Sequence, residues 1–66
     1  MTVMKFVRAT MGMSQSDLAK AIGVTQPKIS MWENKRASMP ARRVEEIARV
    51  LGIAPERLLL DIPFTF

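Results

Sequence analysis

The chain has 66 residues, a formal net charge of +4 and an isoelectric point near 10.4. It contains no cysteine and no histidine, which excludes a disulfide framework and the usual zinc sites and leaves helix packing or dimerisation to stabilise a small core. The positive charge favours a polyanionic partner only modestly, because a surface rich in Lys and Arg also serves solubility. We therefore expect one domain over residues 1–66, with no metal and no cofactor.

Apolar residues at helical spacing begin near the N-terminus and predict a helix over residues 2–11. Thr2 is suited to the N-cap position, and Gly12 to the left-handed residue that ends a helix. Lys5 and Arg8 interrupt the segment, so we expect neither a signal peptide nor a membrane span. The predicted inward face of this helix consists of Val3, Phe6, Val7 and Thr10.

Two short amphipathic runs follow, separated by a three-residue turn. Ser14 and Asp17 match the capping box that starts a helix, and Gly23 ends that helix. Thr25 is a candidate N-cap for the next helix, which has Pro27 in its first turn and extends from Gln26 to Trp32 or Glu33. Helices this short are unstable alone and need a scaffold. The residues predicted to face that scaffold are Leu18, Ala19, Ile22, Ile29 and Trp32.

The C-terminal half predicts two further helices and a tail. Pro40 opens a helix that Gly52 stops, and Pro55 begins a shorter helix through Leu60. Residues 61–66 form an apolar tail with a period-two pattern, in which aromatic side chains should pack against something. The predicted inward residues of the two helices are Val44, Ile47, Ala48, Leu51, Leu58 and Leu59, and the aromatic residues of the tail are Phe64 and Phe66.

Many of these positions together form a known pattern, R-x3-G-x-SQ-x2-LA-x3-GV-x-Q-x2-IS-x-WEN-x5-P, which runs from Arg8 to Pro40. In this pattern the chain resembles the phage repressor/Cro family of helix-turn-helix proteins, and the likeness extends to Asp61. The resemblance implies an all-α, compact five-helix, lambda-repressor-like DNA-binding domain, with the helix-turn-helix at its second and third helices. It also implies sequence-specific binding to double-stranded DNA, usually as a homodimer at an operator, and it fits the cytoplasm of a bacterium or a phage-infected host.

Two features depart from the family pattern. Many members carry Gly after the WEN segment, where this chain has Lys35. We therefore expect Asn34 to take any left-handed conformation there, or the loop to turn differently. The tail differs from the family's helical ending, which leaves the mode of dimerisation open.

The residues expected to contact DNA lie on the outward side of the two central helices and in the loop after them. The Gln26 amide can donate and accept, which matches the N7/N6 edge of adenine, and Gln15 is placed to donate to a phosphate. The resemblance also implies that these two glutamines contact each other as well as the DNA. Lys28 suits guanine or a phosphate, and Met31 suits a thymine methyl group or a partner subunit. The loop residues would contact the backbone. The full set is Gln15, Thr25, Gln26, Pro27, Lys28, Ser30, Met31, Asn34, Lys35 and Arg36.

Other residues are interpreted as structural. The resemblance implies an ion pair between Arg8 and Glu33 that ties the first helix to the end of the third. Trp32 lies on the Ile29 side of its helix and is expected in the core rather than in a base-stacking role. For Arg42 and Arg43 we favour a solubilising role over phosphate contact.

Two classes of function remain, because nothing in the sequence supports catalysis. The first is a DNA-binding transcriptional regulator of the Cro or repressor type. The alternative is an interaction protein with the same fold, such as the antitoxin of a toxin–antitoxin pair, with a protein partner. The tail discriminates between them: we expect Phe64 or Phe66 to cross to a second copy and support self-association.

Overall fold

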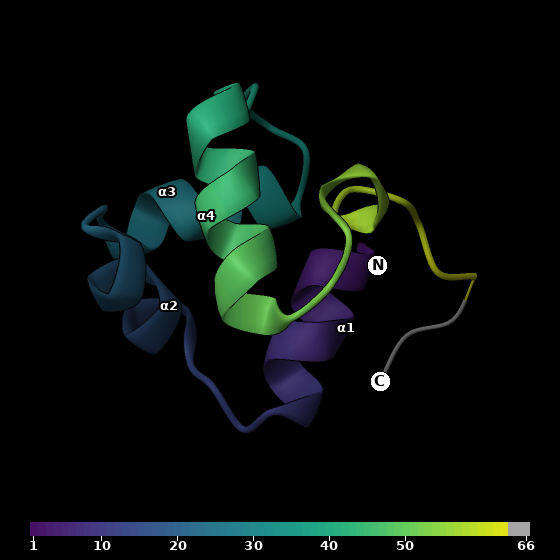
Figure 1. Ribbon diagram of the computed structural model, residues 1–66, viewed down its shortest axis with the longest axis horizontal. Helices are drawn as coiled ribbons and strands as arrows, with labels where there is room; N and C mark the ends of the chain where they lie inside the picture. Colours follow the sequence, from purple (N-terminus) through teal and green to yellow (C-terminus); the bar gives the residue numbers. More distant parts are fainter. Residues whose placement is uncertain (64–66) are drawn as a thin grey trace.

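The computed structural model describes residues 1–63, and within them the chain is helical (Figure 1). Four α-helices and one short 3-10 helix follow one another: α1 (Val3–Thr10), α2 (Gln15–Ile22), α3 (Gln26–Glu33), α4 (Ala41–Leu51) and η1 (Pro55–Arg57). α4 packs against α1, α2 and η1, while α2 and α3 pack against each other. No helix in this part of the chain is long and apolar enough to cross a membrane.

Local capping sets the ends of the central helices. The Ser14 hydroxyl accepts a hydrogen bond from the Asp17 N–H (2.9 Å), and the Asp17 carboxylate accepts one from the Ser14 N–H (3.0 Å). This capping box starts α2, and the bond from the Ser14 N–H holds the pKa of Asp17 below its usual value. Gly23 ends α2 in the left-handed conformation, at φ +74°. Thr25 occupies the N-cap position of α3, but its side chain makes no capping hydrogen bond.

The core lies where the helices meet and is built from apolar side chains of the four α-helices and of the residue after η1. Leu18, Ile29 and Ile47 are fully buried, and so is Leu58, which follows η1. The predicted inward residues of α2 and α3 are buried, and Val44 of α4 is packed against them. The buried apolar residues are Met4, Leu18, Ala19, Ile22, Ile29, Trp32, Ile47, Ala48, Leu51 and Leu58.

The predicted inward face of the first helix was wrong except for Val7, which packs against the core. Met4 and Arg8 are its buried residues, whereas Thr10 is exposed and Val3, Phe6 and Val7 are only half-buried. The periodicity treated Arg8 as an outward residue because it is charged. Its guanidinium is paired inside the protein, so the buried stripe follows the i, i+4 spacing of Met4 and Arg8.

The predicted fifth helix begins at Pro55 as expected but is shorter than predicted. The helical turn after Pro55 ends at Arg57 as a 3-10 helix, and Leu60 is 56% exposed. The carbonyl groups of Leu58 and Leu60 accept hydrogen bonds from the N–H groups of Met4 (2.9 Å) and Val3 (2.8 Å). These N–H groups belong to the first turn of α1 and have no partner within the helix. Residues 58–60 therefore form a turn whose carbonyl groups cap the start of α1, and the helix does not continue.

The hydrogen bonds between residues 58–62 and the start of the chain bring the two ends of the described chain together, as Figure 1 shows. Thr2 and Asp61 form an isolated antiparallel bridge, and the Ile62 N–H donates to the Met1 carbonyl (2.7 Å). The predicted dimerisation residues Phe64 and Phe66 lie outside the described residues.

Candidate nucleic-acid interface

One side of the α2–turn–α3 unit packs against the core and is also contacted by an arginine of α4. Ile29 and Trp32 bury one side of α3. Arg43 donates from Nη1 to the Ile22 carbonyl (2.7 Å) at the end of α2, and also to the Glu46 carboxylate (2.9 Å). Arg43 therefore satisfies a free carbonyl at a helix C-terminus, a contact that its assignment to solubility missed.

The opposite side of α3 is open to solvent. Of the residues predicted to contact DNA, Gln15 and Ser30 are half-buried and the others are exposed. Met31 is 37% exposed, which makes it one of the large apolar side chains on the surface. The exposed members of the predicted set are Thr25, Gln26, Pro27, Lys28, Met31, Asn34, Lys35 and Arg36.

A buried ion pair ties α3 to α1. Arg8 Nε donates to Glu33 Oε2 (2.5 Å), and Arg8 Nη2 donates to Glu33 Oε1 (3.3 Å). The Glu33 side chain is fully buried, and that of Arg8 is 11% exposed. Arg8 Nη1 also donates to the Met13 carbonyl (2.6 Å), in the turn between α1 and α2. One guanidinium thus fixes the end of α3 relative to α1 and to the start of α2.

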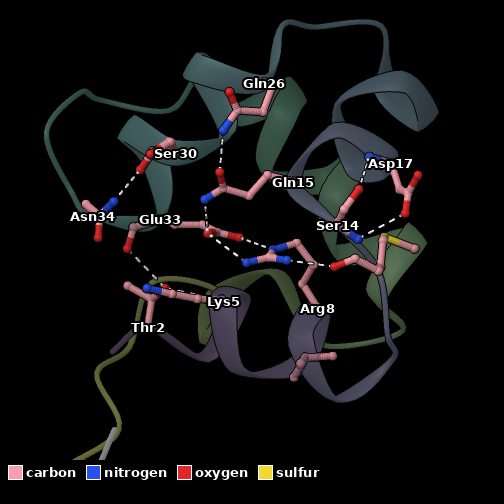
Figure 2. A network of polar contacts seen from close by, with 12 residues as sticks. Thr2, Lys5, Arg8, Ser14, Gln15, Asp17, Gln26, Ser30, Glu33 and Asn34 are labelled. Atoms are coloured by element: carbon pink, nitrogen blue, oxygen red, sulfur yellow. Dashed lines mark hydrogen bonds and ion pairs between the residues drawn. The ribbon is translucent and has the colours of Figure 1, made fainter. Parts of the chain in front are cut away.

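Two glutamines extend this pair to the surface (Figure 2). Gln15 Nε2 donates to Glu33 Oε1 (2.9 Å), and Gln26 Nε2 donates to Gln15 Oε1. The result is a continuous series of hydrogen bonds from α1 to the first residue of α3. We call Arg8, Glu33, Gln15 and Gln26 the polar relay. The family resemblance implied the Arg8–Glu33 pair and the Gln15–Gln26 contact separately, but not the bond from Gln15 to Glu33 that joins them.

The C-terminal end of α3 is organised differently. Lys35 itself takes the left-handed conformation, at φ +56°, so the expectation that Asn34 would do so was wrong. The N–H groups of Lys35 and Arg36 donate to the carbonyls of Trp32 (3.2 Å) and Met31 (2.8 Å), as a helix C-cap requires. The Asn34 side chain caps the Ser30 carbonyl instead (2.8 Å).

The Lys35 ammonium is paired with a residue far along the chain. Lys35 Nζ lies 2.9 Å from Asp61 Oδ2, and the two side chains are 45% and 67% exposed. Asp61 reaches this place because its backbone is bridged to Thr2, whose hydroxyl donates to the Glu33 carbonyl (3.2 Å). The hydrogen bond and charge of Lys35 lower the pKa of Asp61. No pattern in the sequence predicts this contact.

Charge is distributed unevenly around α3. Between Gly23 and Arg43, Glu33 is the only acidic residue, and its carboxylate is buried and paired with Arg8. α3 and the loop after it carry three exposed basic residues, Lys28, Lys35 and Arg36, whereas Arg42 and Arg43 belong to α4. The open side of α3 therefore presents amide, hydroxyl and cationic groups without a carboxylate of its own, and that chemistry suits a polyanion.

Comparison with known proteins identifies the family of the chain. The model of the helix-turn-helix family matches residues 4–58. A hypothetical transcription factor of Neisseria meningitidis serogroup B (strain ATCC BAA-335 / MC58) is 35% identical over 57 residues, which cover 86% of this chain and 54% of that protein. The chain thus spans about half the length of this relative. No solved structure gave a significant match.

Proposed function

The chain belongs to the helix-turn-helix family of the phage repressor and Cro type, and from this premise we propose that it is a transcriptional regulator that binds an operator in double-stranded DNA as a homodimer. α3 is the recognition helix and enters the major groove. Its N-terminal residues contact base edges, as in other helix-turn-helix proteins.

One observation carries this proposal: the open side of α3 has donors and cations but no carboxylate. Gln26 and Lys28 are exposed in its first turn, and the carboxylate of Glu33 is withdrawn into the ion pair with Arg8. A carboxylate on this side would repel the phosphates that flank the groove. Burying it therefore makes the same helix suitable for DNA.

The contacts divide into two kinds. Gln26, Lys28 and Met31 stand where base edges are reached, and the Gln amide can pair with adenine in bidentate fashion. Gln15 at the start of α2 and the loop of residues 34–36 flank them and contact phosphates. Such backbone contacts fix the register of the protein on the duplex.

A second copy is proposed because one recognition helix is short. Eight residues of α-helix span about 12 Å, enough to read only a few base pairs. Two copies related by a two-fold axis would read two half-sites about one helical turn apart, which adds the affinity and specificity that one copy lacks.

Selection of bound duplexes from a random library tests the proposal. We expect a palindromic site with half-sites about 10 base pairs apart, and the mass of the complex should correspond to two chains. Gln26→Ala should lose about 1–3 kcal/mol of discrimination at one base pair of each half-site.

The control is Arg57→Ala, which removes an exposed cation of η1 and should leave discrimination unchanged. Failure to enrich any duplex contradicts the proposed function. Equal weakening by Gln26→Ala on all duplexes contradicts the assignment of base reading to Gln26.

A further inference from the structure

The donors and acceptors of the polar relay follow a fixed order. That order is set by Glu33, whose side chain is fully buried. Both carboxyl oxygens of Glu33 face the Arg8 guanidinium, which can only donate, so both oxygens act as acceptors. The Gln15 side chain that touches Glu33 Oε1 must therefore present its NH2 group to it. Gln15 Oε1 then points the other way, toward Gln26 (Figure 2).

The same reasoning fixes the second glutamine. Gln15 Oε1 is an acceptor, so only the NH2 group of Gln26 can bond to it. Gln26 retains one N–H and its carbonyl oxygen for a ligand. Gln26 and Glu33 are seven residues apart on α3, which is about two turns and places them on one line along the helix. Gln15 from α2 bridges that distance.

We infer that Glu33 is a positioning residue for base recognition: through Gln15 it fixes the amide orientation of Gln26, and so selects adenine over guanine. Adenine presents an N7 acceptor and an N6 donor in the major groove, which one N–H and one carbonyl oxygen match. Guanine presents two acceptors, N7 and O6. A Gln26 amide with one N–H already bonded and its oxygen turned outward meets guanine poorly. The inference rests on the proposed function and adds to it a preference for adenine at the base pair that Gln26 contacts.

The relay also reduces the entropic cost of recognition. A free glutamine side chain is among those that lose the most rotamer freedom when they are ordered. Here the bond to Gln15 orders Gln26 before DNA arrives, and Gln15 is ordered by a fully buried group. Preorganisation of this kind strengthens binding without any new contact.

Two variants test the direction of the relay. Gln15→Met removes the link while leaving the Arg8–Glu33 pair intact. Glu33→Gln reverses the relay. The new amide would accept from Arg8 through its carbonyl and donate to Gln15 through its NH2 group. Gln15 would then donate to the Gln26 carbonyl oxygen, which leaves both N–H groups of Gln26 outward. The control Ser16→Ala changes an exposed neighbour on α2 that is outside the relay.

The probe is a duplex selected by the parent protein, together with the same duplex carrying G·C in place of A·T at the pair read by Gln26. We expect the preference of the parent for the A·T duplex to fall about tenfold or more in Gln15→Met. In Glu33→Gln the preference should shift toward the G·C duplex, and in Ser16→Ala the preference for the A·T duplex should not change. Circular dichroism shows whether each variant is folded, and if Glu33→Gln is not, Gln15→Met alone decides.

A folded Gln15→Met that keeps the parent's preference overturns the inference, even if its affinity for both duplexes falls equally. A parent that binds no duplex contradicts the proposed function instead. The two failures are therefore distinguishable.

Discussion

Among residues 1–63, two ion pairs join segments far apart in the sequence, and they lie in opposite surroundings. Arg8–Glu33 is enclosed, with side chains 11% and 0% exposed, and two further hydrogen bonds, to Gln15 and Met13, extend from it. Lys35–Asp61 lies just beyond it, in the loop after α3, with side chains 45% and 67% exposed. Both pairs anchor the end of α3.

The difference teaches what burial does to an ion pair. A buried charge whose partner is removed cannot be solvated, so Arg8 and Glu33 are strongly dependent on each other. An exposed pair is screened by water and salt and contributes little to stability. Under the proposed function, Lys35 can therefore exchange Asp61 for a phosphate, while the polar relay keeps a single arrangement.

The largest expected effect follows from breaking the buried pair. Arg8→Met should lower the free energy of unfolding by about 3–5 kcal/mol, because Glu33 would remain buried without its cation. Urea denaturation followed by the fluorescence of Trp32, which is 3% exposed, measures this loss. The double variant Arg8→Met/Glu33→Leu leaves no buried charge and should recover most of it. A loss below about 1 kcal/mol, as for surface pairs, would contradict the contrast between the two pairs.

A smaller effect concerns the backbone of Lys35. Glycine has no Cβ penalty at φ +56°, so Lys35→Gly should raise the free energy of unfolding by about 0.5–1 kcal/mol, after the greater freedom of glycine in the unfolded chain is counted. Lys35→Ala is the matched control, because it removes the ammonium but keeps the unfavourable conformation. Equal stability of the Gly and Ala variants would show that the backbone there carries no strain.

The smallest effect is expected from the exposed pair itself. Lys35 lowers the pKa of Asp61 in the folded protein. The Asp61 carboxylate therefore stabilises the folded state fully above its usual pKa of 3.8, and this stabilisation disappears as the pH falls through the folded pKa. Asp61→Asn should therefore be slightly less stable than the parent at neutral pH and equal to it in strong acid. Thermal melts across this range measure the difference. A gap that persists in strong acid would mean that Asp61 acts through something other than its charge.

The helix-turn-helix could be predicted because its signals are local. Ser14 and Asp17 cap α2, Gly23 ends it, and Pro27 marks the first turn of α3, so each boundary is encoded within a few residues. The inward residues of α2, α3 and α4 follow from simple periodicity for the same reason.

What could not be predicted depends on distant partners. Periodicity alone makes the charged Arg8 an outward residue; its pairing with Glu33, 25 residues away, was implied by the family resemblance and by no local signal. The early end of the last helical turn depends on α1, whose first N–H groups take the carbonyls of Leu58 and Leu60. The link from Gln15 to Glu33 likewise needs two helices in contact, which no single stretch of sequence shows.

The pairing of residues 1–3 with residues 58–62 also bears on how the chain folds. Those contacts close almost the entire chain into a loop, whereas the contact of α2 with α3 spans only a short turn. Closing a long loop costs more conformational entropy, and it gains nothing until the helices between are in place. We expect substitutions at Thr2 to accelerate unfolding with little change in the folding rate, and those at Leu18 or Ile29 to slow folding itself.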